Sequence, residues 1–67
     1  MYDYVVAFYL GREFLFNRTN IPIPRVGDTV ENISPDQVDE YIVREVCFEF
    51  YKNNENLNPV VVQLEWR

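Results

Sequence analysis

YIVREVCFEFYK, residues 41–52, is the stretch that decides the fold. In its second half Val46, Phe48 and Phe50 alternate with Glu45, Cys47 and Glu49, the period of two that is typical of a strand with one buried face. The first half is out of phase, and its apolar residues join the same side only if a bulge at residues 44–45 adds one residue. With that bulge, the residues expected on the core-facing side are Tyr41, Val43, Val46, Phe48 and Phe50. We therefore predict a bent central strand, which lets a small sheet curl toward a barrel.

Four other stretches are rich in β-branched and aromatic residues, which favours strands. They are residues 2–10, 13–17, 29–31 and 60–67. Gly11 and Arg12 fit a two-residue hairpin turn between the first two, because glycine accepts the positive φ that such a turn needs. The predicted fold class is mainly β, a small curled antiparallel sheet or SH3-like barrel of about five strands, in a single domain over residues 1–67.

The segment before the central strand carries a helix-start signal. Ser34-Pro35-Asp36-Gln37 has the form of a capping box, with serine at the N-cap and proline at the first helical position. This pattern predicts at most a short helical turn over residues 35–40. A longer helix continuing through Val46 is the competing interpretation, and the β-branched and aromatic residues after Tyr41 favour a strand over it.

Residues 21–24, Ile-Pro-Ile-Pro, cannot form a central strand, because each proline lacks the N–H that a ladder needs. We expect an extended segment at an edge. The turn that follows, residues 25–28, needs a positive φ that Gly27 supplies.

Composition argues against an enzyme. The 67 residues include one cysteine and no histidine, so an internal disulfide, a typical zinc site and histidine-based acid–base catalysis are all unsupported. Cys47 lies between Glu45 and Glu49, whose negative charges disfavour a reactive thiolate, and a small packed or half-buried side chain is expected there. We predict no catalytic residues, no cofactor and no metal.

The net charge of −5 argues against nucleic acid as a partner, because phosphate binding needs clustered Lys and Arg. The acidic residues Asp36, Asp39 and Glu40 are the candidate partner-binding residues, and they would meet a basic surface on another protein. The alternative is that they only form a solvated face that keeps the protein soluble.

The first strand is apolar on both sides, which predicts self-association. Val5, Ala7 and Tyr9 lie opposite its core side and, with Leu15 of the next strand, would form an apolar patch. We expect a two-fold homodimer that covers this patch with itself. In the alternative, residues 21–24 fold over the patch within one chain.

The stretch PRVGDTV (24–30) followed by YIVREVCF (41–48) resembles small bacterial and phage proteins with SH3-like or Sm-like barrels. The resemblance implies a curled β fold and, for a tiny acidic chain, a phage or mobile-element accessory protein that inhibits a bacterial defence protein. A nucleic-acid-associated barrel module and a structural subunit of a phage particle are the alternatives. The lone cysteine, the lack of a signal-peptide pattern and the lack of an apolar run long enough for a membrane span lead us to expect a cytoplasmic protein.

Overall fold

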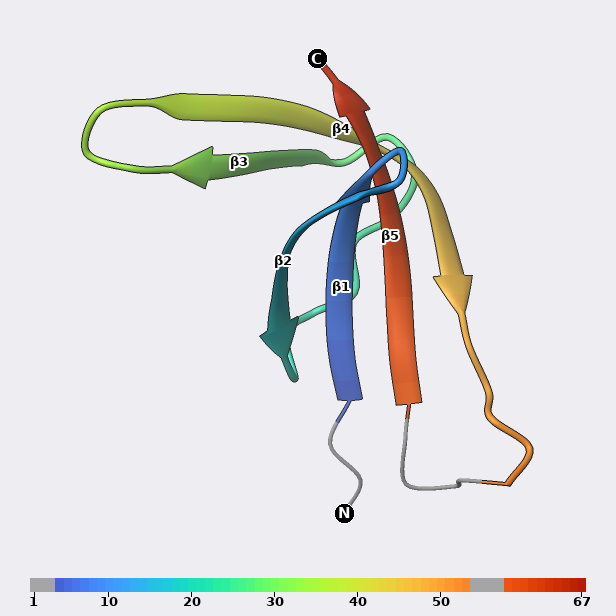
Figure 1. The fold of residues 1–67 in the computed structure, drawn as a ribbon. Helices are drawn as coiled ribbons and strands as arrows, with labels where there is room; N and C mark the ends of the chain where they lie inside the picture. The colour runs from blue at the N-terminus through green and yellow to red at the C-terminus, as the bar shows by residue number, and fades with distance from the viewer. Residues whose placement is uncertain (1–3, 54–57) are drawn as a thin grey trace.

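The computed structural model describes residues 4–53 and 58–67, which form five strands in one curled sheet (Figure 1). The strands are β1 (Tyr4–Leu10), β2 (Glu13–Thr19), β3 (Thr29–Ile33), β4 (Val38–Phe48) and β5 (Asn58–Trp66). Their order across the sheet is β2-β1-β5-β4-β3. The predicted small, mainly β curled sheet is confirmed. Residues 2 and 3 of the predicted first strand lie outside the described residues.

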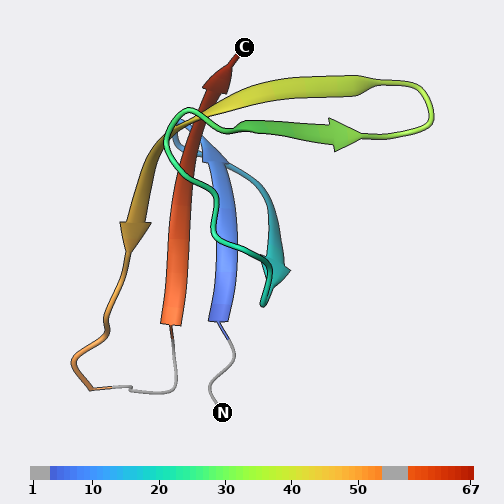
Figure 2. The same cartoon turned by 180° about the vertical axis from the view of Figure 1, so that it is seen from behind.

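One pair of neighbours departs from the predicted antiparallel sheet. β1 and β5 run parallel, with Val6 opposite Val60 and Phe8 opposite Val62. The other three pairs are antiparallel. Residues 20–28 carry the chain from β2 at one edge to β3 at the other, and they cross one face of the sheet (Figure 2). We call residues 20–28 the crossing segment.

β4 is the bent strand that the sequence predicts. Its register against β5 shifts between Val43 and Glu45, which leaves Arg44 as the extra residue of a bulge and confirms the predicted position. Residues 38–42 pair with β3, and residues 41–43 and 45–48 pair with β5, so the two ends of β4 belong to different parts of the sheet.

The β3–β4 hairpin, residues 29–42, leaves the body of the sheet as an arm (Figure 1). The molecule measures 41 × 22 × 20 Å and its radius of gyration is 12.7 Å. A compact chain of this length is expected to have a radius of gyration of about 11 Å. The arm therefore extends the molecule beyond a compact shape.

The core lies on the face of the sheet that the crossing segment covers. Among the described residues, seven side chains are buried: Val6, Phe8, Tyr41, Val43, Val60, Val62 and Leu64. They alternate along β1, β4 and β5, so they share one face, which we call the core face. Ile21 and Ile23 of the crossing segment pack against this cluster. The Tyr4 hydroxyl donates a hydrogen bond to the Ile21 carbonyl and so ties the segment to β1.

The predicted helical turn over residues 35–40 is wrong. Ser34 and Gln37 close a two-residue hairpin turn, in which the Ser34 N–H donates to the Gln37 carbonyl over 2.8 Å and the Gln37 N–H donates back over 3.3 Å. Residues 38–40 then pair with β3. The capping-box pattern does not produce a helix here, because β3 forms hydrogen bonds with the backbone of these residues. The longer helix through Val46 is excluded for the same reason.

The predicted core-facing side of residues 41–52 is correct for its first part only. Phe48 is 53% exposed and Phe50 is 83% exposed, because β4 ends at Phe48. Cys47 is also exposed rather than packed. The two predicted glycine turns are confirmed, since φ is +63° at Gly11 and +95° at Gly27.

Candidate interaction surfaces

The arm presents an unpaired strand edge. β4 covers one side of β3, and no strand of residues 4–53 and 58–67 lies on the other side. Ser34 and Gln37 exchange both backbone hydrogen bonds, and such pairs alternate along an antiparallel ladder. The alternate pairs along β3, which contain Ile33, Glu31 and Thr29, therefore exchange no hydrogen bonds with β4. The N–H and C=O groups of these three residues point away from β4. This edge is available to a further strand.

The predicted partner-binding residues all lie in the arm, but the structure does not gather them into one cluster. Asp36 is exposed in the turn at the tip. Asp39 is half-buried and accepts a hydrogen bond from the Gln37 side-chain amide. Glu40 is exposed, and its Oε2 lies 3.6 Å from Nη1 of Arg67. Neighbouring strand residues point to opposite faces, so Asp39 and Glu40 lie on different faces of the arm.

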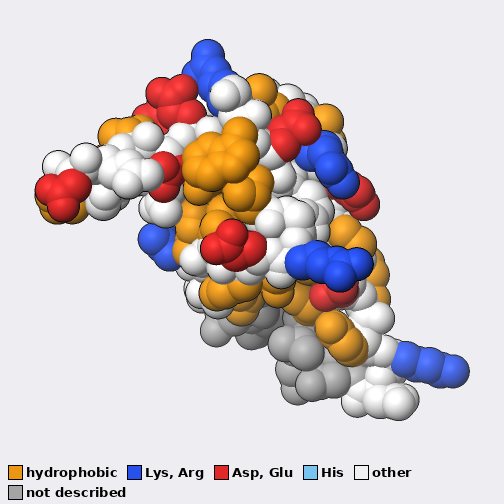
Figure 3. All heavy atoms as spheres, turned by 45° about the horizontal axis from the view of Figure 1, so that its top comes forward, with side chains coloured by type: hydrophobic (Ala, Val, Ile, Leu, Met, Phe, Trp, Pro, Cys, Tyr) orange, Lys and Arg blue, Asp and Glu red, His pale blue; other side chains and the backbone are white. Residues whose placement is uncertain are grey.

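One face of the arm combines apolar and acidic side chains, and we call it the tip face. Ile33 lies opposite Val38, and Glu31 lies opposite Glu40. Ile33 is 69% exposed and Val38 is 50% exposed, so this apolar pair is largely in contact with water. Apolar and acidic side chains meet at the end of the projecting arm, seen at the left of the surface view (Figure 3).

The apolar half of the tip face was not predicted from the sequence, because residues 35–40 were expected to form a helical turn. The sequence does contain a pattern that predicts a hairpin turn at this place. Pro35-Asp36 stands between two β-branched runs that end at Ile33 and begin at Val38, which is a turn signature with a physical mechanism.

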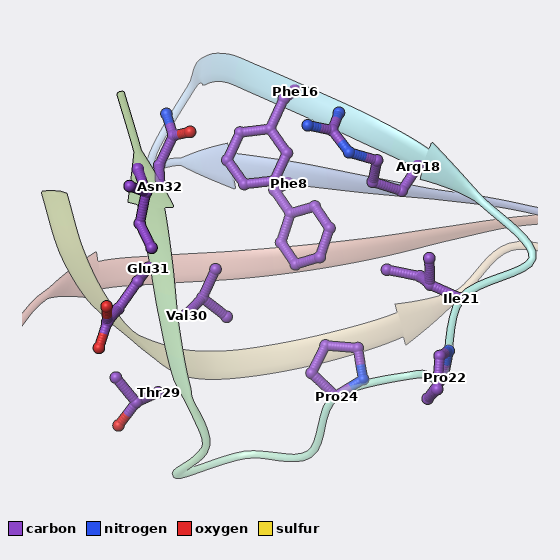
Figure 4. A pocket seen from close by; sticks show the side chains of 11 residues that line it. Phe8, Phe16, Arg18, Ile21, Pro22, Pro24, Thr29, Val30, Glu31 and Asn32 are labelled. Atoms are coloured by element: carbon purple, nitrogen blue, oxygen red, sulfur yellow. The ribbon is translucent and has the colours of Figure 1, made fainter. Parts of the chain in front are cut away.

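A cleft of about 390 Å³ separates β3 from β2 and the crossing segment. Its floor is apolar, and the rings of Phe8 and Phe16 stack there with centroids 4.8 Å apart. Val30 points into the cleft, toward Phe8 and Pro24, whereas Glu31 points away from it (Figure 4). The cleft thus runs along the free edge of β3, on the face opposite the tip face.

Among the described residues that line the cleft, Arg18 of β2 is the one with a cationic side chain. Its guanidinium carbon lies 5.2 Å from the centroid of the Phe16 ring, and its Nη1 donates to the Asn17 carbonyl over 2.6 Å. Arg18 therefore covers an aromatic ring at the β2 side of the cleft.

The predicted self-association residues are only partly brought together. Val5, Ala7 and Tyr9 are half-buried on the face of β1 opposite the core face, which we call the outer face. Leu15 instead packs against the core cluster. A bulge in β2 is the reason, because it places Phe14 opposite Tyr9 and Phe16 opposite Phe8, with Leu15 between them as the extra residue.

The crossing segment does not cover the outer face. Ile21 and Ile23 pack against the core cluster on the other side of the sheet, so the alternative in which residues 21–24 cover Val5, Ala7 and Tyr9 is wrong. The outer face continues onto β5, where Pro59 and Val61 lie beside Val5 and Ala7.

Two observations on the described residues concern metal binding and ionisable groups. Within residues 4–53 and 58–67, no group of three or more Cys, Asp or Glu side chains is placed to hold a metal ion. The Tyr41 phenol has a raised pKa. Burial is the largest cause, and the negative charges of Asp39 and Glu13 raise the pKa further. That change strengthens the neutral form of the phenol and provides no base or nucleophile.

Comparison with protein-family models, with curated proteins and with solved structures gave no match. The resemblance to SH3-like and Sm-like barrels therefore stays a prediction. The part of the chain that the structure describes contains no helix with the length and hydrophobicity needed to span a membrane.

Proposed function

We propose that this chain is a non-enzymatic β protein that acts by binding another protein through the β3–β4 arm. The observation that carries the proposal is the exposed pair Ile33 and Val38 at the end of a projecting hairpin. An isolated two-stranded hairpin is marginally stable in water, so an apolar tip adds little to the fold of a single molecule. Contact with a partner would remove these two side chains from water.

The charge of the arm indicates what kind of surface the partner offers. Asp36, Asp39 and Glu40 all lie in the arm that carries the apolar tip, and the whole chain carries a net charge of −5. A basic surface would be attracted at long range and would orient the arm before contact. Nucleic acid, which is itself negatively charged, would be repelled by the same field.

The resemblance noted in the sequence favours one form of this function, the inhibition of a bacterial protein by a phage or mobile-element accessory protein. A cytoplasmic site of action fits the lone Cys47 and the absence of a disulfide framework. An inhibitor needs only affinity and a surface that blocks its target, which fits a chain of this size.

Charge reversal on the arm tests the proposal. The variant Asp36→Lys/Asp39→Lys/Glu40→Lys changes the arm, and Glu13→Lys/Glu45→Lys/Glu65→Lys makes the same change in net charge at exposed positions elsewhere. Proteins captured by the immobilised wild-type chain from a bacterial lysate are identified, purified and titrated calorimetrically against all three chains. We expect the arm variant to lose at least about tenfold in affinity and wild-type binding to weaken as salt rises.

Two results would contradict the proposal. In the first, both triple variants lose affinity equally, which would show that only the net charge matters. In the second, the wild-type chain retards single- or double-stranded oligonucleotides at physiological salt, which would favour a nucleic-acid-associated module.

A further inference from the structure

We propose that the partner supplies an extended segment that adds as a strand to the free edge of β3, and that this segment alternates apolar with basic residues. The inference rests on the proposed protein-binding function and states how the arm would perform it. The backbone edge, the cleft and the acidic pair of the tip face each specify one property of the segment.

The backbone edge specifies an extended conformation. The outward N–H and C=O groups of Thr29, Glu31 and Ile33 are spaced to pair with every second residue of an added strand. β2, the other edge strand, is less suited, because its bulge at Leu15 interrupts the spacing of its backbone groups. β3 pairs with β4 without a break from Thr29 to Ile33, so its free edge is regular.

The cleft specifies apolar side chains on one face of the added strand. Val30, Phe8 and Phe16 line the cleft beside the β3 edge, and its volume of about 390 Å³ admits several side chains. A strand placed beside β3 points every second side chain toward this floor. Burying them there would exclude water from the half-buried Phe16 ring, which stacks on the buried Phe8 ring.

The tip face specifies basic side chains at the alternate positions. Glu31 and Glu40 face each other across the arm, and Arg67 reaches only Glu40. Glu31 makes no ion pair with any described residue. A lysine or arginine opposite Glu31 on the added strand would relieve the repulsion between the two carboxylates and pair with the unpartnered one.

The same charges exclude a second copy of this chain as the added strand. Two β3 edges paired about a two-fold axis would bring the central Glu31 of each copy together, between two molecules of net charge −5. Like charges placed opposite each other destabilise strand pairing. The occupant is therefore a segment of a different protein.

Three capped heptapeptides test the inference on the intact protein. One alternates lysine with valine, the second has the same residues in two separate blocks, and the third alternates glutamate with valine. Binding is followed by heteronuclear NMR titration and by amide hydrogen exchange. We expect the alternating lysine peptide to bind at least about tenfold more tightly than either control. The amides of Thr29, Glu31 and Ile33 should gain protection from exchange.

Two variants at Glu31 separate charge from backbone pairing. Glu31→Gln removes the carboxylate and keeps the N–H, whereas Glu31→Pro removes both. The Glu31 N–H points away from β4, so proline there leaves the β3–β4 ladder intact. We expect Glu31→Gln to weaken the alternating lysine peptide and Glu31→Pro to abolish its binding. The exchange protection in the wild-type protein provides the same test even if Glu31→Pro fails to fold.

Several outcomes would overturn strand addition: no binding of the alternating lysine peptide, equal binding of the block peptide, or chemical-shift changes confined to the outer face. The proposed function is judged separately, from the captured protein. If Glu31→Pro leaves the affinity for that protein unchanged while charge reversal of the arm weakens it, strand addition is wrong and protein binding by the arm stands.

Discussion

Tyr41 stands where three strands meet, opposite Val30 of β3 and Trp66 of β5. Its ring is buried, and the centroid of the Trp66 ring lies 4.7 Å away. Burial raises the pKa of the phenol above its ordinary value of 10.0, and the negative charges of Asp39 and Glu13 raise it further. At the junction between the arm and the body of the sheet, the surroundings of Tyr41 thus favour its neutral phenol over the phenolate.

This shift predicts a loss of stability in alkaline solution. Because the folded-state pKa of Tyr41 is higher than the unfolded one, its contribution is complete below about pH 10 and falls as the pH rises through the folded-state value. Urea unfolding of Tyr41→Phe should decline less over that range than unfolding of the wild type. Tyr51→Phe, at an exposed position, is the control. Parallel curves for wild type and Tyr41→Phe would show that this phenol does not determine alkaline stability.

Two valines of β4 test the assignment of the core. Val43 is 1% exposed inside the cluster, whereas Val38 lies at the tip of the arm. Val43→Ala should lower the free energy of unfolding by about 2 kcal/mol, since it removes buried methyl groups and leaves a cavity. Val38→Ala should change it by less than about 0.5 kcal/mol. Equal losses in urea unfolding would place the arm inside the cooperative core.

Among the structural elements, the arm carries a charge arrangement that disfavours its own pairing. Glu31 and Glu40 lie directly opposite each other on the tip face. Glu31→Lys should therefore raise the free energy of unfolding by about 0.2–1 kcal/mol at low salt, and the gain should shrink as salt screens the pair. Urea titrations at two salt concentrations measure both effects. A variant less stable than the wild type at low salt would mean that Glu31 has a stabilising partner.

The sequence allowed prediction of the features that are set locally. Residues 44–45 show the bulge through a break in alternation, and Gly11 and Gly27 show turns through their conformational freedom. The parallel pairing of β1 with β5 has no local signature, because alternation shows which face of a strand is buried and not which strand lies beside it. The candidate site was predicted only in part for the same reason. The acidic residues of the arm are visible in the sequence, while the cleft exists only once β3 and the crossing segment come together.

For the molecule as a whole, the outer face is the surface that the fold leaves without a covering layer among the described residues. Val5, Ala7 and Tyr9 lie there beside Pro59 and Val61. We propose that a two-fold homodimer covers this face, which would leave the arm of each copy free for its partner.

Light scattering at micromolar concentration tests the homodimer. We expect a mass twice the 8.1 kDa of one chain. Val5→Glu or Tyr9→Glu should return the mass to that of a monomer, because a carboxylate would be buried in the interface. Val26→Glu, at an exposed position of the crossing segment, should leave the dimer unchanged. A wild-type mass of 8.1 kDa would rule out the dimer.

The parallel pairing of β1 with β5 also determines when the protein can fold during its synthesis. The two strands come from opposite ends of the described chain and lie side by side in the middle of the sheet, where they supply five of the seven buried side chains. A nascent chain that ends before residue 58 lacks Val60, Val62 and Leu64, and it lacks the strand that lies between β1 and β4. Folding must then wait until β5 has left the ribosome and has paired with β1, which lies far away in the sequence and so gives the domain a high contact order. Until that moment the apolar strands that have already been made stay exposed to chaperones and proteases.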